Sequence, residues 1–125
     1  MAATALSSPV LPTQPDDQVV ERLRQVLFAE RAAQSALVAE HRSTSEALTG
    51  QRDVDSILER EIADASAVRA HDAVEAIDGA LAAIAAGSYG VCESCGTSIP
   101  VERLEAVPHA RFCVACASRN ASAAR

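Results

Sequence analysis

The chain has 125 residues, enough for one ordinary domain, and 49% of them are hydrophobic although only 2% are aromatic. Its formal net charge of −6 argues against a general grip on nucleic acid, because proteins of that class usually present a basic face. A core of Ala, Val, Leu and Ile buries little area per residue, which favours long, closely packed helices over a thick globule.

Residues 1–15 contain three prolines and several serines and threonines, a composition typical of a disordered tail. The segment has neither a basic region nor a long apolar run, so it does not predict a signal peptide. No stretch of the sequence approaches the roughly eighteen apolar residues that a membrane span requires. We therefore expect a cytoplasmic protein, in a compartment where disulfides are disfavoured.

A first helix is expected to begin at Asp16 and Asp17, where two carboxylates suit the positive end of a helix dipole. Apolar residues at helical spacing mark one face of it: Val20, Leu23 and Leu27, with a weaker extension through Leu37 and Leu48. The segment 48–53 interrupts this pattern. Gly50 is suited to end the first helix, and Asp53 is suited to cap the second.

The second helix is expected to run to Gly87. Its apolar positions follow a and d spacing: Val74, Ile77, Leu81 and Ile84, with Leu58 and Ile62 near its start. Two helices of about 33 residues joined by a short turn predict an antiparallel hairpin over residues 16–86, about 50 Å long, with the turn near 49–53. A hairpin that covers its own apolar face favours a monomer.

All four cysteines lie in two Cys-x-x-Cys pairs, Cys92 with Cys95 and Cys113 with Cys116. Such pairs form disulfides, act in redox chemistry or bind a metal. Seventeen residues separate the pairs, and that spacing is typical of a zinc site. Two intervening residues let a tight turn aim both thiolates at one ion, and Gly96 suits a turn that needs a positive φ angle.

Four thiolates leave no open coordination position, so the spacing predicts one structural Zn²⁺ and argues against catalysis at the metal. His109 lies between the two pairs and is the alternative ligand. The chain also lacks a phosphate-binding loop and a recognisable nucleophile and base pair. We therefore expect that the protein is not an enzyme.

Residues 87–116, GSYGVCESCGTSIPVERLEAVPHARFCVAC, closely resemble the DksA/TraR family of bacterial transcription factors. The features that match are Gly90, the run Cys92-Glu93-Ser94-Cys95-Gly96, Ile99, the run Arg103-Leu104-Glu105-Ala106, and Pro108. The resemblance implies a mainly α fold in which a coiled-coil hairpin precedes a C4 zinc-finger region with a short C-terminal helix. We place this region at residues 87–119 and expect a flexible tail at 120–125.

The resemblance also implies a protein that binds RNA polymerase and makes no sequence-specific contact with DNA. Members of the family insert their hairpin into the secondary channel of the polymerase, bring an acidic tip near the catalytic centre and alter the lifetime of open promoter complexes. One alternative is an adaptor whose zinc-capped hairpin binds another protein. A DNA-binding zinc finger is a third possibility, disfavoured by the sequence pI of about 4.9.

At the tip, the sequence departs from the family pattern Asp-x-x-Asp-x-Ala. Aligning Asp55 with the second aspartate puts Ile57 on the alanine and Arg52 on the first aspartate. Asp53 is a candidate replacement for the lost acid, so Asp53 and Asp55 are the candidate tip residues. The alternative interpretation is a helix cap and a first-turn carboxylate.

Arg69 matches an arginine of the family and is a candidate contact for the polymerase rim, the alternative being a solvated side chain. The best-known family members also help to bind the alarmone ppGpp through basic side chains. Here the corresponding positions are Ala76, Val107 and Ala117, none of which can pair with a phosphate. The sequence therefore predicts regulation without ppGpp.

Overall fold

The computed structural model describes residues 15–123. The tail expected at residues 1–15 thus lies outside the described residues, apart from Pro15. The described part contains α2 (Asp17–Leu48), α3 (Val54–Ala86), α4 (Val101–Ala106) and α5 (Val114–Ala123). Within it, the only β-type pairing is an isolated antiparallel bridge between Val91 and Ser98. None of these helices combines the length and the apolar composition that crossing a membrane requires.

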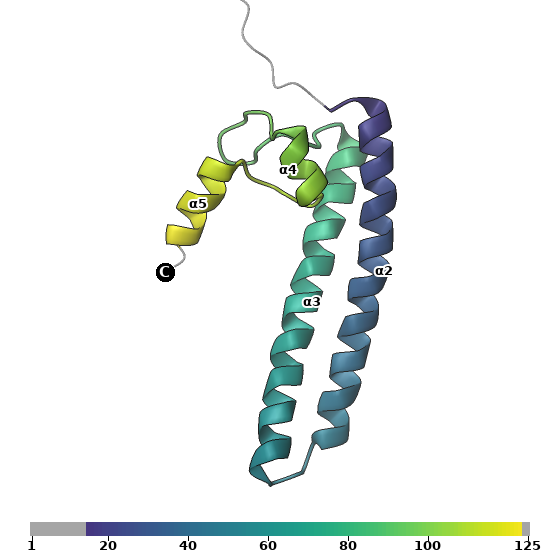
Figure 1. Ribbon diagram of the computed structural model, residues 1–125, viewed down its shortest axis with the longest axis vertical. Coiled ribbons are helices and arrows are strands. Elements are labelled where there is room, and N and C mark those ends of the chain that lie inside the picture. The colour runs from purple at the N-terminus through teal and green to yellow at the C-terminus, as the bar shows by residue number, and fades with distance from the viewer. Residues whose placement is uncertain (1–14, 124–125) are drawn as a thin grey trace, which may run out of the picture.

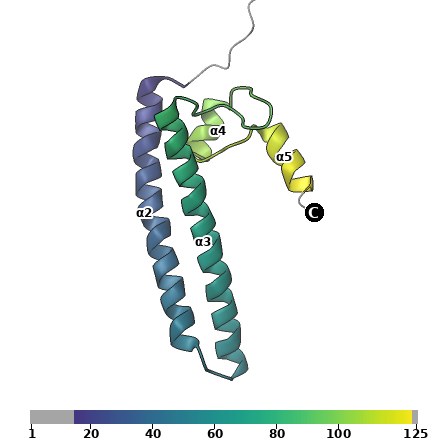
Figure 2. The ribbon, with the colours of Figure 1, turned by 180° about the vertical axis from the view of Figure 1, so that it is seen from behind.

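The two long helices, α2 with 32 residues and α3 with 33, lie side by side as an antiparallel hairpin (Figures 1 and 2). The chain turns back at residues 49–53, far from both ends of the described chain (Figure 1). Helix α4 lies beside the other end of the hairpin, which we call the base, and α5 projects away from it. The predicted mainly α hairpin fold is confirmed.

Local capping determines where the long helices begin and end. A carboxylate oxygen of Asp16 accepts a hydrogen bond from the second backbone N–H of its helix at 2.8 Å, and Asp53 accepts one from Ser56 at 2.9 Å. Gly50 in the turn has a φ angle of +91° and Gly87, after α3, one of +78°. Only glycine adopts this backbone conformation without strain.

The base of the hairpin contains the large buried side chains. Leu23 and Leu27 of α2 pack with Ile77 and Ala80 of α3, and neither Leu27 nor Ile77 retains any exposed surface. Burying a side chain of this size stabilises a fold by about 1.5–3 kcal/mol, so these few residues supply much of the hairpin's stability.

The interface between α2 and α3, which we call the seam, has a different composition in the half of the hairpin nearer the turn. There α3 buries only alanine against α2, at Ala63, Ala67 and Ala70. A hydrogen bond also joins the two helices there: Ser45 Oγ of α2 donates to Asp64 Oδ1 of α3 at 2.5 Å. Small side chains let the helices approach closely but bury little area, so this half is held less strongly than the base.

The prediction that Leu58 and Ile62 extend the buried face of α3 is wrong, because these side chains are 50% and 64% exposed. The heptad positions that continue the buried face of Ile77 toward the turn are alanines. Leu58 and Ile62 fall between those positions and point outward. On α2, Leu37 is 38% exposed, which agrees with its weak place in the predicted stripe.

Helix α5 extends to Ala123, so the boundary expected at residue 119 falls inside it. The flexible tail expected from residue 120 is therefore corrected for residues 120–123, while residues 124–125 lie outside the described range. No glycine or proline occurs between residues 114 and 123, and alanine favours the helix.

Replacing the buried isoleucine and an exposed one on the same helix will show where the hairpin gains its stability. We expect Ile77→Ala to lower the free energy of unfolding by about 2–5 kcal/mol, because it leaves a cavity in the core. Ile62→Ala should change it by less than about 0.5 kcal/mol. Urea unfolding followed by far-UV circular dichroism measures both, and equal losses would place Ile62 in the seam after all.

Candidate zinc site

The first cysteine pair lies in a tight turn between α3 and α4. The Cys92 N–H donates to the carbonyl oxygen of Thr97 at 2.8 Å, and the Gly96 N–H donates to the carbonyl oxygen of Cys92 at 2.9 Å. Gly96 has a φ angle of +76°, as the position after the second cysteine was predicted to require. These bonds fold the chain back and bring Cys95 onto the same side as Cys92.

The second pair lies at the start of α5. Cys113 immediately precedes the helix, Cys116 is in its first turn, and the Ala117 N–H donates to the carbonyl oxygen of Cys113 at 2.9 Å. This single helical turn places both sulfur atoms on the side that faces the first pair.

The four sulfur atoms come together as one group, all within 4.8 Å of one another. Sγ of Cys95 and Sγ of Cys113 are 3.8 Å apart. A tetrahedral ion with Zn–S bonds of about 2.3 Å requires sulfur atoms about 3.8 Å apart, so the arrangement fits Zn²⁺. His109, the alternative ligand, is outside this group.

The thiols differ in their tendency to ionise. Burial acts to raise the pKa of Cys92, but backbone N–H donors within the two pairs outweigh it and lower that pKa to about 6. The Thr97 hydroxyl, 2.9 Å from Sγ of Cys95, lowers the pKa of Cys95. The neighbouring Cys113 thiol, together with burial, raises the pKa of Cys116 to about 11. A bound cation would remove this difference, because it favours the thiolate at all of its ligands.

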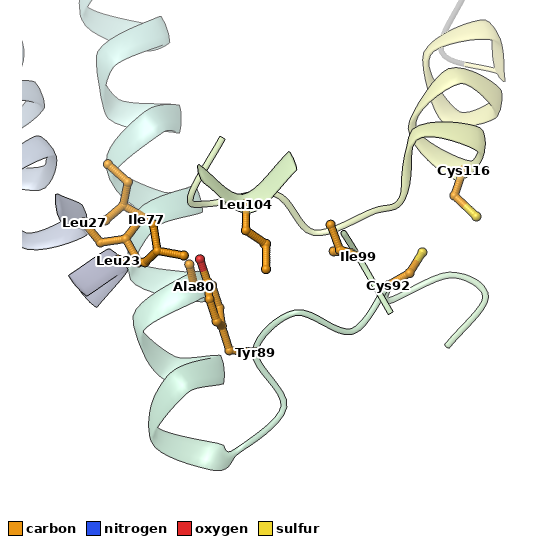
Figure 3. Packing of buried hydrophobic residues seen from close by; sticks show 9 residues of the cluster. All are labelled: Leu23, Leu27, Ile77, Ala80, Tyr89, Cys92, Ile99, Leu104 and Cys116. Carbon is orange, nitrogen blue, oxygen red and sulfur yellow. The ribbon is translucent and has the colours of Figure 1, made fainter. Parts of the chain in front are cut away.

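A chain of buried side chains joins the cysteine group to the base of the hairpin (Figure 3). Tyr89 and Leu104 lie between the hairpin core and Ile99, which leads on to Cys92 and Cys116. The Tyr89 hydroxyl donates to the carbonyl oxygen of Pro108 at 2.7 Å, and burial raises the pKa of this phenol to about 12.

Gly90 permits the closest approach in this junction. Its φ angle is +85°, and a Cβ atom there would lie 3.0 Å from Cδ of Pro15 and 3.4 Å from Cδ1 of Leu104. Helix α4 is also tied to α2 directly, because Arg22 Nη2 lies 2.6 Å from Glu105 Oε1. The zinc-finger region therefore has a defined seat on the base of the hairpin.

The other predicted site residues lie far from the cysteines. Asp53 caps α3, and its bond to the Ser56 N–H lowers its pKa. Asp55 is exposed in the first turn of α3. Arg69 is exposed farther along α3, where Nη2 donates to Ser66 Oγ at 3.1 Å. The structure thus brings the four cysteines together and leaves the tip residues at the opposite end of the hairpin.

Sequence reasoning missed the residues that seat the zinc finger. In the sequence, Ile99 and Leu104 are only matches to a family and Tyr89 carries no signal of a role, yet all three are buried. The available signal was the presence of large apolar residues close to the cysteines in a short region with few others. Sequence reasoning also missed Arg119, whose Nη2 lies 3.1 Å from Sγ of Cys116.

The structure is that of a helical hairpin with a four-cysteine zinc-finger region at its base. Residues 87–120 match the family model of the prokaryotic dksA/traR C4-type zinc finger. The predicted resemblance to the DksA/TraR family is thereby confirmed for this region. Together with the clustered sulfur atoms, the match supports one structural zinc ion.

The whole described fold is similar to that of a solved transcription factor, DksA2 from Pseudomonas aeruginosa. The TM-score is 0.74, the sequences are 24% identical, and the alignment covers 90% of this chain and 94% of the other. At this identity the comparison establishes the fold alone.

Two curated relatives match over a shorter segment. An uncharacterized protein from Aquifex aeolicus is 54% identical over 41 residues, which is 33% of this chain and 28% of the relative. General stress protein 16O from Bacillus subtilis is also 54% identical over 41 residues, covering 25% of its own length. The chain therefore spans only about a quarter of the length of the curated relatives that it matches.

The zinc content tests the site directly. Protein purified under reducing conditions should contain one zinc per chain, and Cys92→Ser should weaken zinc binding by more than about 100-fold, because it removes one of four ligands. Ser94→Ala, in the same turn, is the matched control and should keep its zinc. Elemental analysis before and after competition with a chelator measures both. Wild-type protein with far less than one zinc and with disulfides would contradict the site.

Proposed function

We propose that this chain regulates transcription by binding RNA polymerase through its secondary channel and modulating the stability of open promoter complexes. One observation carries the proposal: a DksA/TraR-type zinc finger at residues 87–120 sits at the base of a hairpin whose fold is similar to that of a DksA2 transcription factor. A fold alone hosts many functions, so the family match of the zinc finger is the part that narrows the choice.

The long, narrow shape of the hairpin is suited to insertion into the secondary channel of the polymerase. Two helices side by side are about 20 Å wide, and the hairpin is about 50 Å long. The first part of α3, together with its cap Asp53, is acidic, with five carboxylates against one arginine between residues 53 and 64. This charge disfavours contact with a nucleic-acid backbone and leaves protein as the favoured partner.

In this proposal the metal shapes the protein and takes no part in chemistry. Cys92, Cys95, Cys113 and Cys116 would hold one zinc ion with no open coordination position, so the metal offers no catalytic site. The proposed role of the chain is that of a regulator and not of an enzyme. The ion would hold the far side of the finger together, while Tyr89 and Leu104 attach the finger to the hairpin base. Arg69, exposed on α3, is the proposed contact for the rim of the polymerase.

Binding to the polymerase is the first test. The zinc-loaded chain, immobilised, should retain RNA polymerase, and a known secondary-channel binder added in excess should release it. Failure to retain the polymerase contradicts the proposal and favours the alternative of an adaptor for another protein. Retention that the competitor does not affect would place the binding outside the channel.

Asn substitutions separate the charge of the tip from its structure. Asp55→Asn should weaken the effect on promoter-complex lifetime while leaving polymerase affinity within about threefold, because binding contacts extend along the hairpin. Asp53→Asn removes the other charge and retains a residue that caps a helix equally well. Lifetimes of open complexes measured with a competitor DNA test both variants. If Asp55→Asn acts like wild type, Asp55 is only a first-turn carboxylate.

The proposal includes independence from ppGpp. The positions that carry cations in the best-known family members are Ala76, Val107 and Ala117, which offer no charge. Each lost charge-assisted hydrogen bond removes roughly 1.5–3 kcal/mol. The loss of two such bonds would cost about 3–6 kcal/mol, which lowers the affinity for ppGpp by about 100-fold or more.

The nearby arginines are already engaged. Arg111 forms an ion pair with Glu93, and Arg119 lies against Sγ of Cys116. Ala76 lines a surface depression together with Asp72 and Glu75 as well as with Glu93 and Arg111. The carboxylates outnumber the cation there, which disfavours a polyphosphate anion.

Transcription in vitro tests this part. With the chain and its own polymerase, added ppGpp should give no more than the sum of the two separate effects. Reactions without the chain provide the control, because the polymerase can bind ppGpp elsewhere. Synergy between the chain and ppGpp would refute independence.

A further inference from the structure

The first half of α3 carries four of its five large apolar side chains on the outside, and the fifth, Ile57, is half-buried. Val54, Leu58, Ile62 and Val68 are 69%, 50%, 64% and 59% exposed. We call these four residues the outer apolar face. The buried side of the same segment holds only alanine, so the usual arrangement of an amphipathic helix is reversed here.

Helical geometry gathers the outer apolar face into one stripe. At about 100° per residue, the four side chains fall within an arc of roughly 120°, on the side of α3 opposite its seam with α2. An arc of this width is what a helix normally turns toward a core. Ala65 lies within it, and Glu61 is the acidic residue that shares it.

Folding of the chain does not account for this face. Single exposed apolar residues are common on proteins and need no explanation, but a contiguous stripe marks a surface that contacts something else.

A second copy of the chain is a poor occupant. The outer apolar face amounts to a few hundred Å², whereas each partner in a stable complex usually buries about 800 Å². Pairing two copies would also bring together two segments that each hold five carboxylates and one arginine between residues 53 and 64. Like charges brought this close oppose association.

We propose that the outer apolar face docks into an apolar groove with a cationic rim on a partner protein. The carboxylates of Asp55, beside the face, and Glu61, within it, match such a rim. This inference rests on the proposed function, in which the partner is RNA polymerase. The face then supplies much of the affinity of the hairpin, and its small area is supplemented by the rest of the hairpin inside the channel.

The experiment compares two double variants of the zinc-loaded full chain. Leu58→Gln with Ile62→Gln removes the centre of the face and should weaken binding to RNA polymerase by at least about 30-fold. Val26→Gln with Phe28→Gln changes two exposed apolar residues of α2 and should alter binding by less than about threefold. Thermal unfolding of both variants should stay close to that of wild type, since all four side chains are exposed.

The outcomes separate this inference from the proposed function. If wild type binds the polymerase and Leu58→Gln with Ile62→Gln binds equally well, the docking face is wrong and the proposed function stands. If wild type does not bind the polymerase at all, both fail. If wild type sediments as a dimer that the same double variant abolishes, the occupant is a second copy, and the proposed partner is wrong.

Discussion

One small apolar core at the base of the hairpin joins every part of the described structure. Leu23 and Leu27 from α2 meet Ile77 from α3, and Tyr89 and Leu104 extend the same core into the zinc-finger region. The finger has no separate apolar core. On the side away from the hairpin, its fold is therefore stabilised by the cysteine group and by the metal that this group fits. Metal binding and packing on the hairpin together therefore determine its position.

This concentration of large side chains at the base has a consequence at the other end. The seam near the turn consists of alanines on α3 and gains little free energy from burial. Its outer side is consequently free to carry Leu58 and Ile62 without harm to the fold. In the proposed function, the base is the rigid mount, and the weakly buried half of the hairpin is the part that meets the polymerase.

The sequence was sufficient to predict the hairpin and the cysteine group, because both depend on local chemistry. Asp16, Asp53 and Gly87 cap helices through their own side chains or backbone freedom, and two Cys-x-x-Cys pairs make similar local turns. The outward position of Leu58 could not be predicted, since the spacing of the apolar residues in α3 fits more than one heptad frame. In the correct frame the buried positions are alanines, and hydrophobic patterns seldom distinguish a buried alanine from an exposed one. Tyr89 lies in a loop, where periodicity gives no guidance.

In the proposed function, the turn of the hairpin enters the polymerase while the zinc finger stays outside. Crosslinking measures this most directly, with a photoreactive residue placed either at Gln51 in the turn or at Ser118 on α5, both exposed. The account predicts that position 51 crosslinks to polymerase segments lining the secondary channel and that position 118 does not. Crosslinks to the channel from position 118 alone, or none from position 51 in a complex that forms, would contradict it.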